Sequence, residues 1–507
     1  MLNESAHRDR FTRDHLPPLE LWPRFTFPHA YSTRLNAASE LLEGAIRQGF
    51  GRRPALIGEE GVWSYEALLE KVNRIARVLV EALGLVPGNR VLLRGANTPM
   101  MAACWLAVVR AGGVAVATMP LLRARELTHI IEKAKIKFAL CEKALERELA
   151  AARSTSPSLE RVLYFADREA SGLEARMASM APDFAGAATS HDDVALIAFT
   201  SGTTGPAKGT LHFHRDLLAI CDGFSRSVLK PGPEDVFCGS PPLAFTFGLG
   251  GLVLFPLRAG AATLLLPKLG AEGLLAAIER HRASLCFTAP TLYRAMSEHV
   301  PRFDLSSLKK CVSAGEALPL AVFEAWRRAT GIRIIDGIGA TEMLHIFISA
   351  QEDAIRPGAT GKPIPGYEAC ILDEEGHVLP ANSIGRLAVR GPTGCRYLDN
   401  LEQQKKYVRD GWNLTGDAYR MDEDGYFWYV ARTDDMIISA GYNISGPEIE
   451  TVLLDYEAVQ ECAVVGAPDP ERGEIVKAFI VLRPGQVGDE AMVRALQDHV
   501  KAVIAPY

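Results

Sequence analysis

Short β-rich runs alternate with helical runs through the first half of the chain. Residues 91–93 and 114–117 are rich in β-branched or small apolar side chains, and residues 98–109 between them have the pattern of a helix. The same alternation recurs over residues 127–141. Successive strands joined by helices of this length pair most readily in parallel, with helices packed on both faces of the sheet. The alternation therefore predicts an α/β fold built on mainly parallel sheet.

The pattern changes twice further along. Residues 183–193 are small and polar, and we expect them to link the first α/β unit to a second alternating unit over residues 194–348. After Gly358, short strands such as 369–372 and 385–390 are separated by glycine and proline. Short strands separated by glycine and proline predict an antiparallel or barrel-like section.

The C-terminal part has the pattern of a small α+β domain. A helix is predicted from Pro447, two strands within residues 461–482, and a last helix from Asp489. Together with the preceding units, this predicts a large domain over residues 1–433 and a small domain over residues 434–507.

Composition and charge exclude several classes of protein. The 507 residues are 48% hydrophobic, and 61 acidic against 55 basic side chains give a net charge of −6, without the basic surplus typical of nucleic-acid binders. No apolar run reaches the roughly 18 residues of a membrane span, and the N-terminus lacks the apolar core of a signal peptide. The nine cysteines include no CxxC pair and are expected to be reduced thiols. These features predict a soluble, cytoplasmic protein with neither a nucleic-acid nor a membrane partner.

A segment rich in glycine and hydroxyl groups carries the strongest chemical signal. It runs from Phe199 to Gly209, follows an apolar strand expected over residues 194–199, and includes Lys208. Glycines let backbone N–H groups turn toward a ligand, hydroxyls add donors and lysine adds charge, so the segment suits a polyphosphate. It lacks the glycine spacing of a Walker loop. The alternative interpretation is a flexible surface loop.

This segment resembles the phosphate-binding signature of the adenylate-forming superfamily, which contains acyl- and aryl-CoA synthetases, peptide-synthetase adenylation domains and luciferases. Three further motifs similar to those of the family follow in the family's order: Gly-Ile-Gly-Ala-Thr-Glu at 337–342, Leu-Thr-Gly-Asp at 414–417, and Arg-Thr-Asp-Asp at 432–435 with Gly441. Each motif alone would usually be a cap or a turn. The ordered set covers nearly the whole chain and is far more specific.

The resemblance implies a large domain of two helix-covered, mostly parallel sheets plus a barrel-like section, followed by a small mobile α+β domain. It also implies ATP, Mg²⁺ and coenzyme A as cofactors. Thr200 and Lys208 would hold the β- and γ-phosphates, Thr341 would touch the α-phosphate, and Glu342 would help to hold Mg²⁺, which favours oxygen ligands. Asp417, supported by Arg432, would accept hydrogen bonds from the ribose. The nucleotide- and CoA-binding residues implied in this way are Ser201, Gly202, Thr203, Thr204, Gly205, Gly315, Glu316, Asp336, Asp417, Arg432 and Gly441.

Asp434 matches the family's hinge between the two domains. A hinge lets one active site serve two reactions, because the small domain closes for adenylation and then rotates to admit the thiol of coenzyme A. A solvated turn is the alternative interpretation of Asp434 and its neighbour Asp435.

Residues 242–250 and 342–347 look most like those of benzoate-type CoA ligases. That resemblance implies an aromatic carboxylic acid as substrate. Without it, Phe247 would be ordinary core and His345 a satisfied helix histidine. Residues 237–258 and 437–443 look closest to 2-aminobenzoate–CoA ligases, while benzoate and hydroxybenzoates stay open as substrates. The residues expected to line the acid pocket are Thr246, Phe247, Gly339, His345 and Ile346.

Two departures from the family pattern matter. Ile338 stands where many relatives have tyrosine, so adenine would stack on the backbone around residues 315–317 and 336–337. The family's adenylating lysine, in a Gly-Lys context, has no counterpart before Tyr507. We expect that lysine to lie in a tail beyond Tyr507; a protein ending there would be crippled in adenylation and less affected in thioester formation.

Two other functions compete with the CoA ligase as interpretations of this sequence. A module that loads a carrier protein is disfavoured because no carrier-domain serine motif follows. A catalytically impaired nucleotide- or aryl-acid-binding relative is disfavoured by the full set of Lys208, Glu342, Asp417 and Arg432. The oligomeric state stays open; a homodimer is common among relatives but has no warrant in this sequence.

Overall fold

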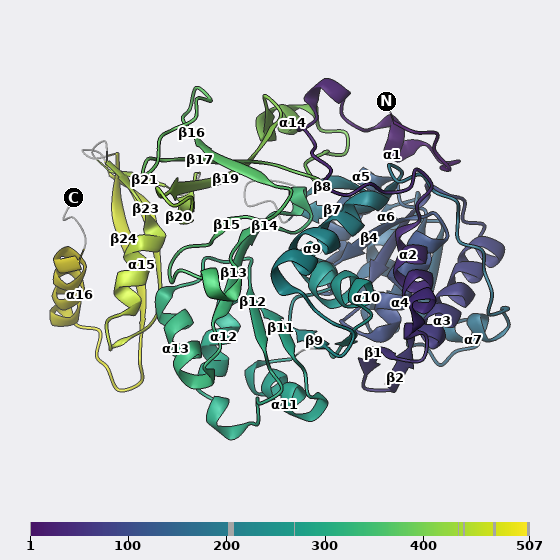
Figure 1. Ribbon diagram of the computed structural model, residues 1–507, viewed down its shortest axis with the longest axis horizontal. Coiled ribbons are helices and arrows are strands. Elements are labelled where there is room, and N and C mark those ends of the chain that lie inside the picture. The colour runs from purple at the N-terminus through teal and green to yellow at the C-terminus, as the bar shows by residue number, and fades with distance from the viewer. Residues whose placement is uncertain are drawn as a thin grey trace.

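The computed structural model describes residues 2–200, 207–267, 269–433, 436–439, 442–469 and 473–503. Within these ranges the strands form four sheets (Figure 1). Each of the nine cysteines is free. In the described part of the chain, no helix combines the length and apolar character needed to cross a bilayer.

The first sheet is parallel except at one edge. Its strands are β3 (Arg90–Arg94), β4 (Val114–Thr118), β5 (Phe138–Glu142), β6 (Arg161–Phe165), β7 (Val194–Thr200) and β8 (Lys208–Phe213), in the order β6-β5-β3-β4-β7-β8. Its helices are α3 (Tyr65–Arg77), α4 (Pro99–Arg110), α5 (Ala124–Ala134) and α6 (Glu146–Thr155). Leu92 packs with α5 and α6 and Leu93 with α3 and α4, so helices cover both faces. The exception is β8, which pairs antiparallel with β7.

Helix α3 illustrates how the local sequence sets these elements. It begins after Ser64, whose Oγ accepts a hydrogen bond from the N–H of Ala67 at 3.1 Å and caps the helix. Leu68, Val72 and Ile75 fall on one face and are fully buried. Each such side chain stabilises the fold by about 1.5–3 kcal/mol relative to an exposed one.

The second sheet has a parallel centre and antiparallel edges, in the order β15-β14-β13-β12-β11-β9-β10-β1-β2. Its strands are β1 (Pro54–Gly58), β2 (Gly61–Ser64), β9 (Val236–Gly239), β10 (Ala262–Leu264), β11 (Leu285–Thr288), β12 (Lys310–Ser313), β13 (Ile334–Gly339), β14 (Ile346–Ser349) and β15 (Lys362–Pro363). Its main helices are α2 (Ala37–Ala45), α8 (His214–Ile220), α9 (Thr246–Leu249), α10 (Phe255–Ala259), α11 (Ala271–His281), α12 (Pro290–Ser297) and α13 (Leu320–Thr330).

The boundary between these two units differs from the prediction. Residues 183–193 were expected to lead into a new unit, but β7 follows them and joins the first sheet, where Leu196 pairs with Ala115 of β4. Conversely, β1 from the start of the chain pairs with β10 of the second sheet. The apolar run of β7 fits beside β4, and local patterning cannot reveal which sheet a buried strand joins.

The third sheet is antiparallel, as the glycine and proline residues between its short strands predict. Its order is β16-β17-β19-β18, with β20 paired to β19. The elements are β16 (Glu368–Leu372), β17 (Ile384–Arg390), α14 (Leu401–Tyr407), β18 (Val408–Arg409), β19 (Trp412–Met421) and β20 (Phe427–Arg432).

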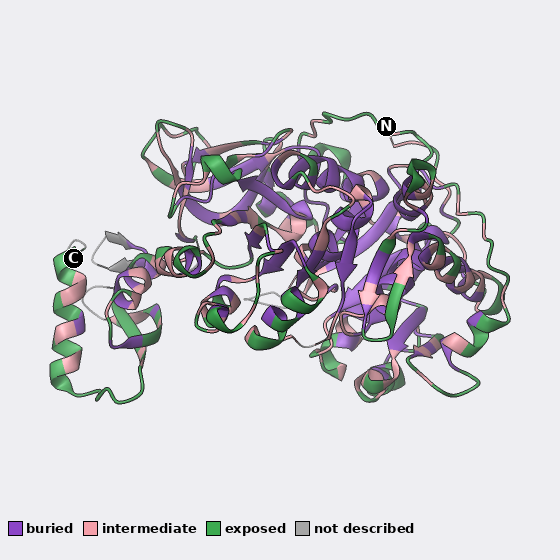
Figure 2. Cartoon of the chain, turned by 60° about the horizontal axis from the view of Figure 1, so that its bottom comes forward, coloured by how far each residue is buried: buried purple, intermediate pink, exposed green. Residues whose placement is uncertain are grey.

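The C-terminal part has a sheet and a small core of its own. Its elements are β21 (Ile437–Ser439), β22 (Tyr442–Ile444), α15 (Gly446–Leu454), β23 (Val459–Asp469), β24 (Gly473–Leu482) and α16 (Glu490–Val503). Ile449, Leu453 and Leu496 belong to a cluster separate from the cores of the other sheets. Burial is densest in the large sheets, and α16 is largely exposed (Figure 2). The predicted α/β class with a large and a small domain is confirmed, whereas the boundary at residue 434 stays a prediction.

Candidate functional site

The hairpin formed by β7 and β8 brings two predicted phosphate ligands together. Thr200 ends β7 and Lys208 begins β8, and the two residues pair across the hairpin. Both are partly exposed. The expected ligands between them lie outside the described residues: Ser201, Gly202, Thr203, Thr204 and Gly205.

Thr341 and Glu342 lie in a single 3₁₀ turn, η8 (Thr341–Met343), which follows β13. The Glu342 carboxylate accepts a hydrogen bond from the Tyr397 hydroxyl at 2.5 Å. Burial raises the pKa of Glu342, while the positive charges of Lys208 and Arg432 act in the opposite direction. Since both cations influence this carboxylate, the fold gathers predicted residues from three motifs into one electrostatic cluster.

Asp417 and Arg432 face each other across β19 and β20, as their predicted partnership requires. Arg432 Nη1 donates to Asp417 Oδ1 at 3.1 Å, and Asp417 is only 8% exposed. Gly416 has a φ of +79°, and a Cβ there would lie 2.9 Å from Arg432 Nη2. A side chain at position 416 would therefore be strained and would push against the guanidinium.

Gly315 lies at the carboxyl end of β12, and Asp336 lies where the parallel pairing of β12 with β13 ends. Gly315, with a φ of +92°, follows β12, and Asp336 in β13 pairs with Ser313. Ligands of open α/β sheets commonly bind at this edge. Glu316 is exposed and accepts a hydrogen bond from the Thr291 hydroxyl at 2.5 Å.

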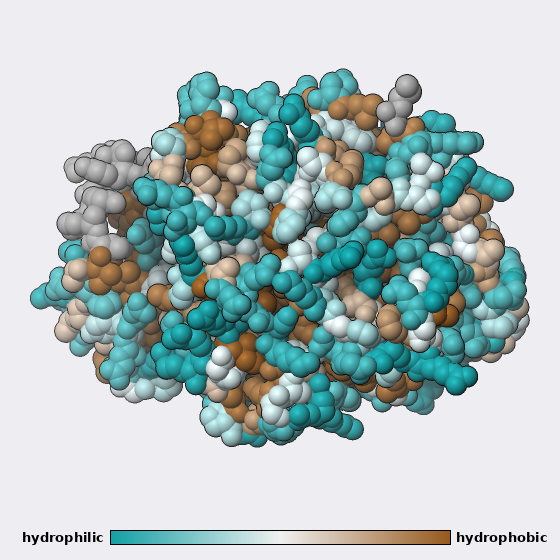
Figure 3. Space-filling view, viewed as in Figure 1, coloured by the Kyte–Doolittle hydropathy of each residue, from teal (hydrophilic) through white to brown (hydrophobic). Residues whose placement is uncertain are grey.

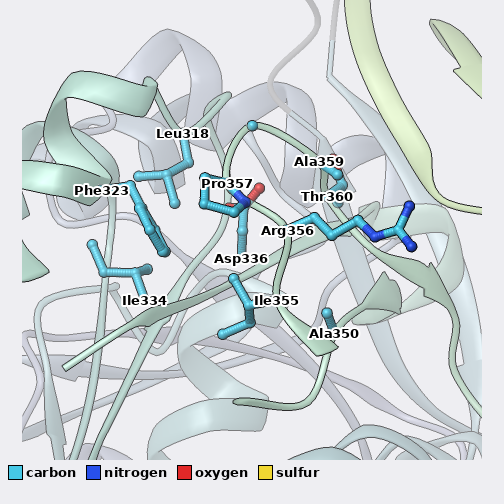
Figure 4. Close-up of a pocket in the computed structure, with 11 residues that line it drawn as sticks. Leu318, Phe323, Ile334, Asp336, Ala350, Ile355, Arg356, Pro357, Ala359 and Thr360 are labelled. Carbon is cyan, nitrogen blue, oxygen red and sulfur yellow. The ribbon is translucent and has the colours of Figure 1, made fainter. Parts of the chain in front are cut away.

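Asp336 also borders a small cavity, shown in Figure 4, together with Phe323, Pro357 and Arg356. Its Oδ1 has no hydrogen-bond partner within the described residues. The Arg356 guanidinium points away in the figure and pairs with Asp424 at 2.8 Å. Burial accordingly raises the pKa of Asp336 to about 7.

His345 lies at the centre of an aromatic cluster. Its ring centroid is 4.5 Å from that of Phe255 and 5.7 Å from those of Phe224 and Phe247. The side chain is 2% exposed, and neither ring nitrogen reaches hydrogen-bonding geometry with a described residue. Burial lowers the pKa of His345 to about 3, although the nearby backbone of Phe247 opposes this shift. The imidazole is therefore neutral near pH 7.

The other predicted pocket residues adjoin this cluster. Thr246 and Phe247 begin α9, and Phe247 also packs on Phe287, with ring centroids 5.7 Å apart. Gly339 pairs with Ile346 across β13 and β14, and a Cβ on Gly339 would lie 2.8 Å from the His345 backbone. His345 follows the last residue of η8 by two positions in the chain, so the two groups of predicted residues adjoin there.

Several residues at this site were not found from the sequence. Phe224 and Phe255 look like ordinary core residues, and no motif singles out Tyr397, His212 or Thr393. Side-chain hydrogen bonds over long sequence separations bring Tyr397, His212 and Thr393 to η8, and ring packing brings Phe224 and Phe255 to His345. Two predicted residues, Asp434 and Gly441, lie outside the described residues.

The face of the molecule seen in Figure 3 is mostly hydrophilic, with smaller hydrophobic areas between the hydrophilic ones. No group of three or more His, Cys, Asp or Glu side chains in the described ranges could hold a metal ion alone. An ion at Glu342 would therefore take further ligands from the substrate or solvent.

Comparison with known proteins gives concordant matches. The profile of the AMP-binding enzyme family matches residues 45–397, and that of the AMP-binding enzyme C-terminal domain matches residues 448–507. The benzoate–CoA ligase of Thauera aromatica is 34% identical over 482 residues, which cover 94% of this chain and 91% of that protein.

Two solved structures are similar over almost the same span. The anthranilate CoA ligase AuaEII in complex with anthranoyl-AMP superposes with a TM-score of 0.89 at 33% identity, covering 94% of this chain and 92% of that one. A benzoate CoA ligase from Burkholderia xenovorans LB400 gives a TM-score of 0.84 at 30% identity, covering 93% and 94%.

Proposed function

The chain belongs to the AMP-binding enzyme family and is an acid–thiol ligase, and on this premise we propose that it activates 2-aminobenzoate or a closely related benzoate with ATP and transfers the aryl group to coenzyme A. The family resemblance inferred from the four motifs is confirmed. Aryl-acid CoA ligase activity agrees with the relatives named as benzoate and anthranilate CoA ligases.

The position of His345 is the observation that carries the proposal. His345 follows the turn that holds Thr341 and Glu342 by two residues, and its ring packs against Phe247 and Phe255. An aryl acid must place its ring among apolar groups and its carboxylate at the α-phosphate of ATP, and these two environments adjoin here. Offset or edge-to-face contacts with Phe247 would favour a ring over an aliphatic chain.

The first half-reaction makes an aryl-adenylate. A carboxylate oxygen of the acid attacks the α-phosphorus of ATP, and the bond from that phosphorus to the pyrophosphate oxygen breaks. Lys208 and Thr200 would neutralise and orient the departing phosphates, while Thr341 would contact the α-phosphate. Groups already aimed at such developing charge are an enzyme's main means of lowering this barrier.

The nucleoside would be held at both ends. Asp417, oriented by Arg432, would accept hydrogen bonds from the ribose hydroxyls. Gly315, Glu316 and Asp336 would border the adenine, with Asp336 offering an acceptor to its amino group. The unpartnered Oδ1 of Asp336 in the described structure supports this role.

Glu342 fits a magnesium ion. Its carboxylate offers oxygen ligands for a metal ion close to Lys208, which is proposed to bind phosphate. Mg²⁺ commonly binds one or two carboxylates together with substrate phosphates. When bound there, the ion would supply charge neutralisation on the phosphate oxygens. Glu342 itself would fix where the phosphates lie relative to Lys208.

The second half-reaction forms the thioester. The thiolate of coenzyme A attacks the acyl carbon, and the bond between that carbon and the AMP oxygen breaks, releasing AMP. We assign Asp434 to the hinge that would reorient the small domain, residues 434–507, for this step, and Gly441 to the CoA channel. Such gating needs no chemistry at Asp434 itself.

An ortho amino group would give His345 a hydrogen-bond partner, which no described residue supplies. A neutral imidazole offers one donor and one acceptor, and either can meet an aromatic amine. A site with an unpaired buried polar group discriminates against an analogue that leaves that group unpaired. This reasoning favours 2-aminobenzoate over benzoate, with a 2-hydroxybenzoate as the runner-up.

Acid-dependent release of pyrophosphate tests the proposal. Purified protein with ATP and Mg²⁺ is offered benzoate, 2-aminobenzoate, 2-hydroxybenzoate or hexanoate, and coenzyme A is then added for mass spectrometry of the thioester. We expect pyrophosphate and a thioester with the aryl acids, and most with 2-aminobenzoate. Release of pyrophosphate without any CoA thioester would contradict the ligase assignment, and a preference for hexanoate would contradict the aryl pocket.

A further inference from the structure

Each residue of the η8 turn is held by a side chain from elsewhere in the chain. His212 Nε2 lies 2.9 Å from the Thr341 carbonyl oxygen. Tyr397 Oη donates to Glu342 Oε1 at 2.5 Å, and Thr393 Oγ1 donates to the Met343 carbonyl at 2.6 Å. Three consecutive residues therefore have three separate anchors, and only the Tyr397 anchor touches a side chain with a proposed role.

The direction of each bond follows from its chemistry. A carbonyl only accepts, so the neutral His212 carries its proton on Nε2. Burial lowers the pKa of His212 to about 4, consistent with a neutral ring. The Thr393 hydroxyl donates its one proton to the Met343 carbonyl. The Tyr367 hydroxyl, with its oxygen 2.6 Å from Thr393 Oγ1, therefore donates to Thr393. The anchors form a consistent network.

The segment that carries Tyr397 is fastened to the strand that carries Lys208. The N–H of Leu211 donates to the Arg396 carbonyl, and the N–H of Leu398 donates to the Gly209 carbonyl, both at 2.8 Å. Arg396 also makes a fully buried ion pair with Asp216, with Nη1 and Oδ2 2.7 Å apart. Tyr397 thus links Glu342 to the backbone of β8.

We propose that Tyr397 is a positioning residue that fixes the Glu342 carboxylate relative to Lys208, so that a nucleotide bound with a divalent cation meets both groups at a set separation. The inference rests on the proposed function. A carboxylate that binds a metal is commonly oriented by a hydrogen bond from an outer residue, and loss of such a bond typically lowers metal affinity or activity about 10- to 100-fold.

Ring packing is the competing explanation for Tyr397. Its ring lies edge-on to that of Tyr407, with centroids 5.8 Å apart, and the side chain is 2% exposed. A purely structural tyrosine would need its ring and not its hydroxyl. The Tyr397→Phe variant keeps the ring and separates the two explanations.

Tyr407→Phe is a matched control. It removes a hydroxyl from the neighbouring ring, and the Tyr407 hydroxyl has no hydrogen-bond partner among the described residues. ATP binding is measured by calorimetry at a series of Mg²⁺ concentrations for the wild type and both variants, together with the thermal midpoint. Y397F is expected to need about 10- to 100-fold more Mg²⁺ for the same ATP affinity, with ATP binding without Mg²⁺ unchanged. Y407F is expected to match the wild type.

A double-mutant cycle keeps the test decisive if Y397F also lowers stability. In a Glu342→Ala background, Tyr397→Phe should have no further effect on the Mg²⁺ requirement, because its partner is gone. A wild-type Mg²⁺ requirement in Y397F, or an equal effect with and without Glu342, would overturn the positioning role. Failure of the wild type to release pyrophosphate with any acid would instead count against the proposed function.

Discussion

The nucleotide half and the acid half of the candidate site satisfy their polar groups differently. Glu342 and Asp417 each have a hydrogen-bonding partner from another segment of the chain, Tyr397 and Arg432. In the acid half, His345 is buried among aromatic rings and neither nitrogen has a described partner. An unpaired buried polar group costs about 1–3 kcal/mol. Glu342 and Asp417 are thus paired without ligand, and in the nucleotide half Asp336 Oδ1 is left for the adenine to satisfy, whereas the acid half is completed only by a substrate with a polar substituent.

The largest expected effect is in the nucleotide half. Glu342→Ala removes the carboxylate proposed to meet Mg²⁺ and should lower acid-dependent pyrophosphate release about 100-fold or more, because lost electrostatic stabilisation of a transition state typically has this size. Steady-state kinetics with 2-aminobenzoate would measure it. Glu375→Gln, at an exposed position, serves as the control. A loss below fivefold would remove Glu342 from the proposed machinery.

The next effect is on stability in acid and concerns the acid half. The folded pKa of His345, about 3, lies below its ordinary value of 6.5, so between these values the unfolded chain binds more protons. The stability of the wild type should therefore fall as the pH drops below 6.5, with His345 accounting for about 2 kcal/mol at pH 5.

His345→Leu removes this contribution. Denaturant midpoints at pH 7.5 and pH 5 should fall less in the variant than in the wild type. Equal falls in the two proteins would mean that His345 is not held neutral in the folded state.

A smaller effect is expected on substrate choice. His345→Leu keeps an apolar side chain but removes both nitrogens, so the preference for 2-aminobenzoate over benzoate should decrease about tenfold, mainly through slower turnover of 2-aminobenzoate. The ratio of the two kcat/KM values measures it. An unchanged ratio would show that the amino group is recognised elsewhere, and it would contradict the claim that a polar substituent of the substrate pairs with His345.

The smallest expected effect is at Gly416. Gly416→Ala places an alanine at a strained φ of +79°, and its Cβ would push against the Arg432 guanidinium. Because Arg432 orients Asp417, the KM for ATP should rise about fivefold. Gly425→Ala is the matched control, because Gly425 also has a φ of +79° but an added Cβ there would have nothing within 4 Å. An equal rise in both variants would assign the effect to backbone strain alone.

Local patterning predicted the elements better than their assembly. The helix from Pro447, the antiparallel section after Gly358 and the final helix near Asp489 are present as predicted. The assignment of β7 to a second unit was wrong, because the pairing of buried parallel strands depends on tertiary packing that neighbouring residues do not encode.

The nucleotide half was also more accessible to sequence reasoning than the acid half. Lys208, Glu342 and Asp417 stand in motifs that each resemble an ordinary cap or turn but together follow the order of the family, which makes the set specific. Phe247 and His345 have the appearance of core residues and were identified only through family resemblance. Tyr397 was missed because its link to Glu342 is a side-chain hydrogen bond between residues 55 positions apart in the chain.

The most direct test of this contrast is a competition for the acid half. Equimolar benzoate, 2-aminobenzoate, 2-hydroxybenzoate and hexanoate are offered together with ATP, Mg²⁺ and coenzyme A, and the thioesters are quantified by mass at early times, when their ratio equals the ratio of kcat/KM values. The account predicts that 2-aminobenzoyl-CoA dominates, followed by the other aryl thioesters. Dominance of hexanoyl-CoA, or equal amounts of all four thioesters, would contradict it.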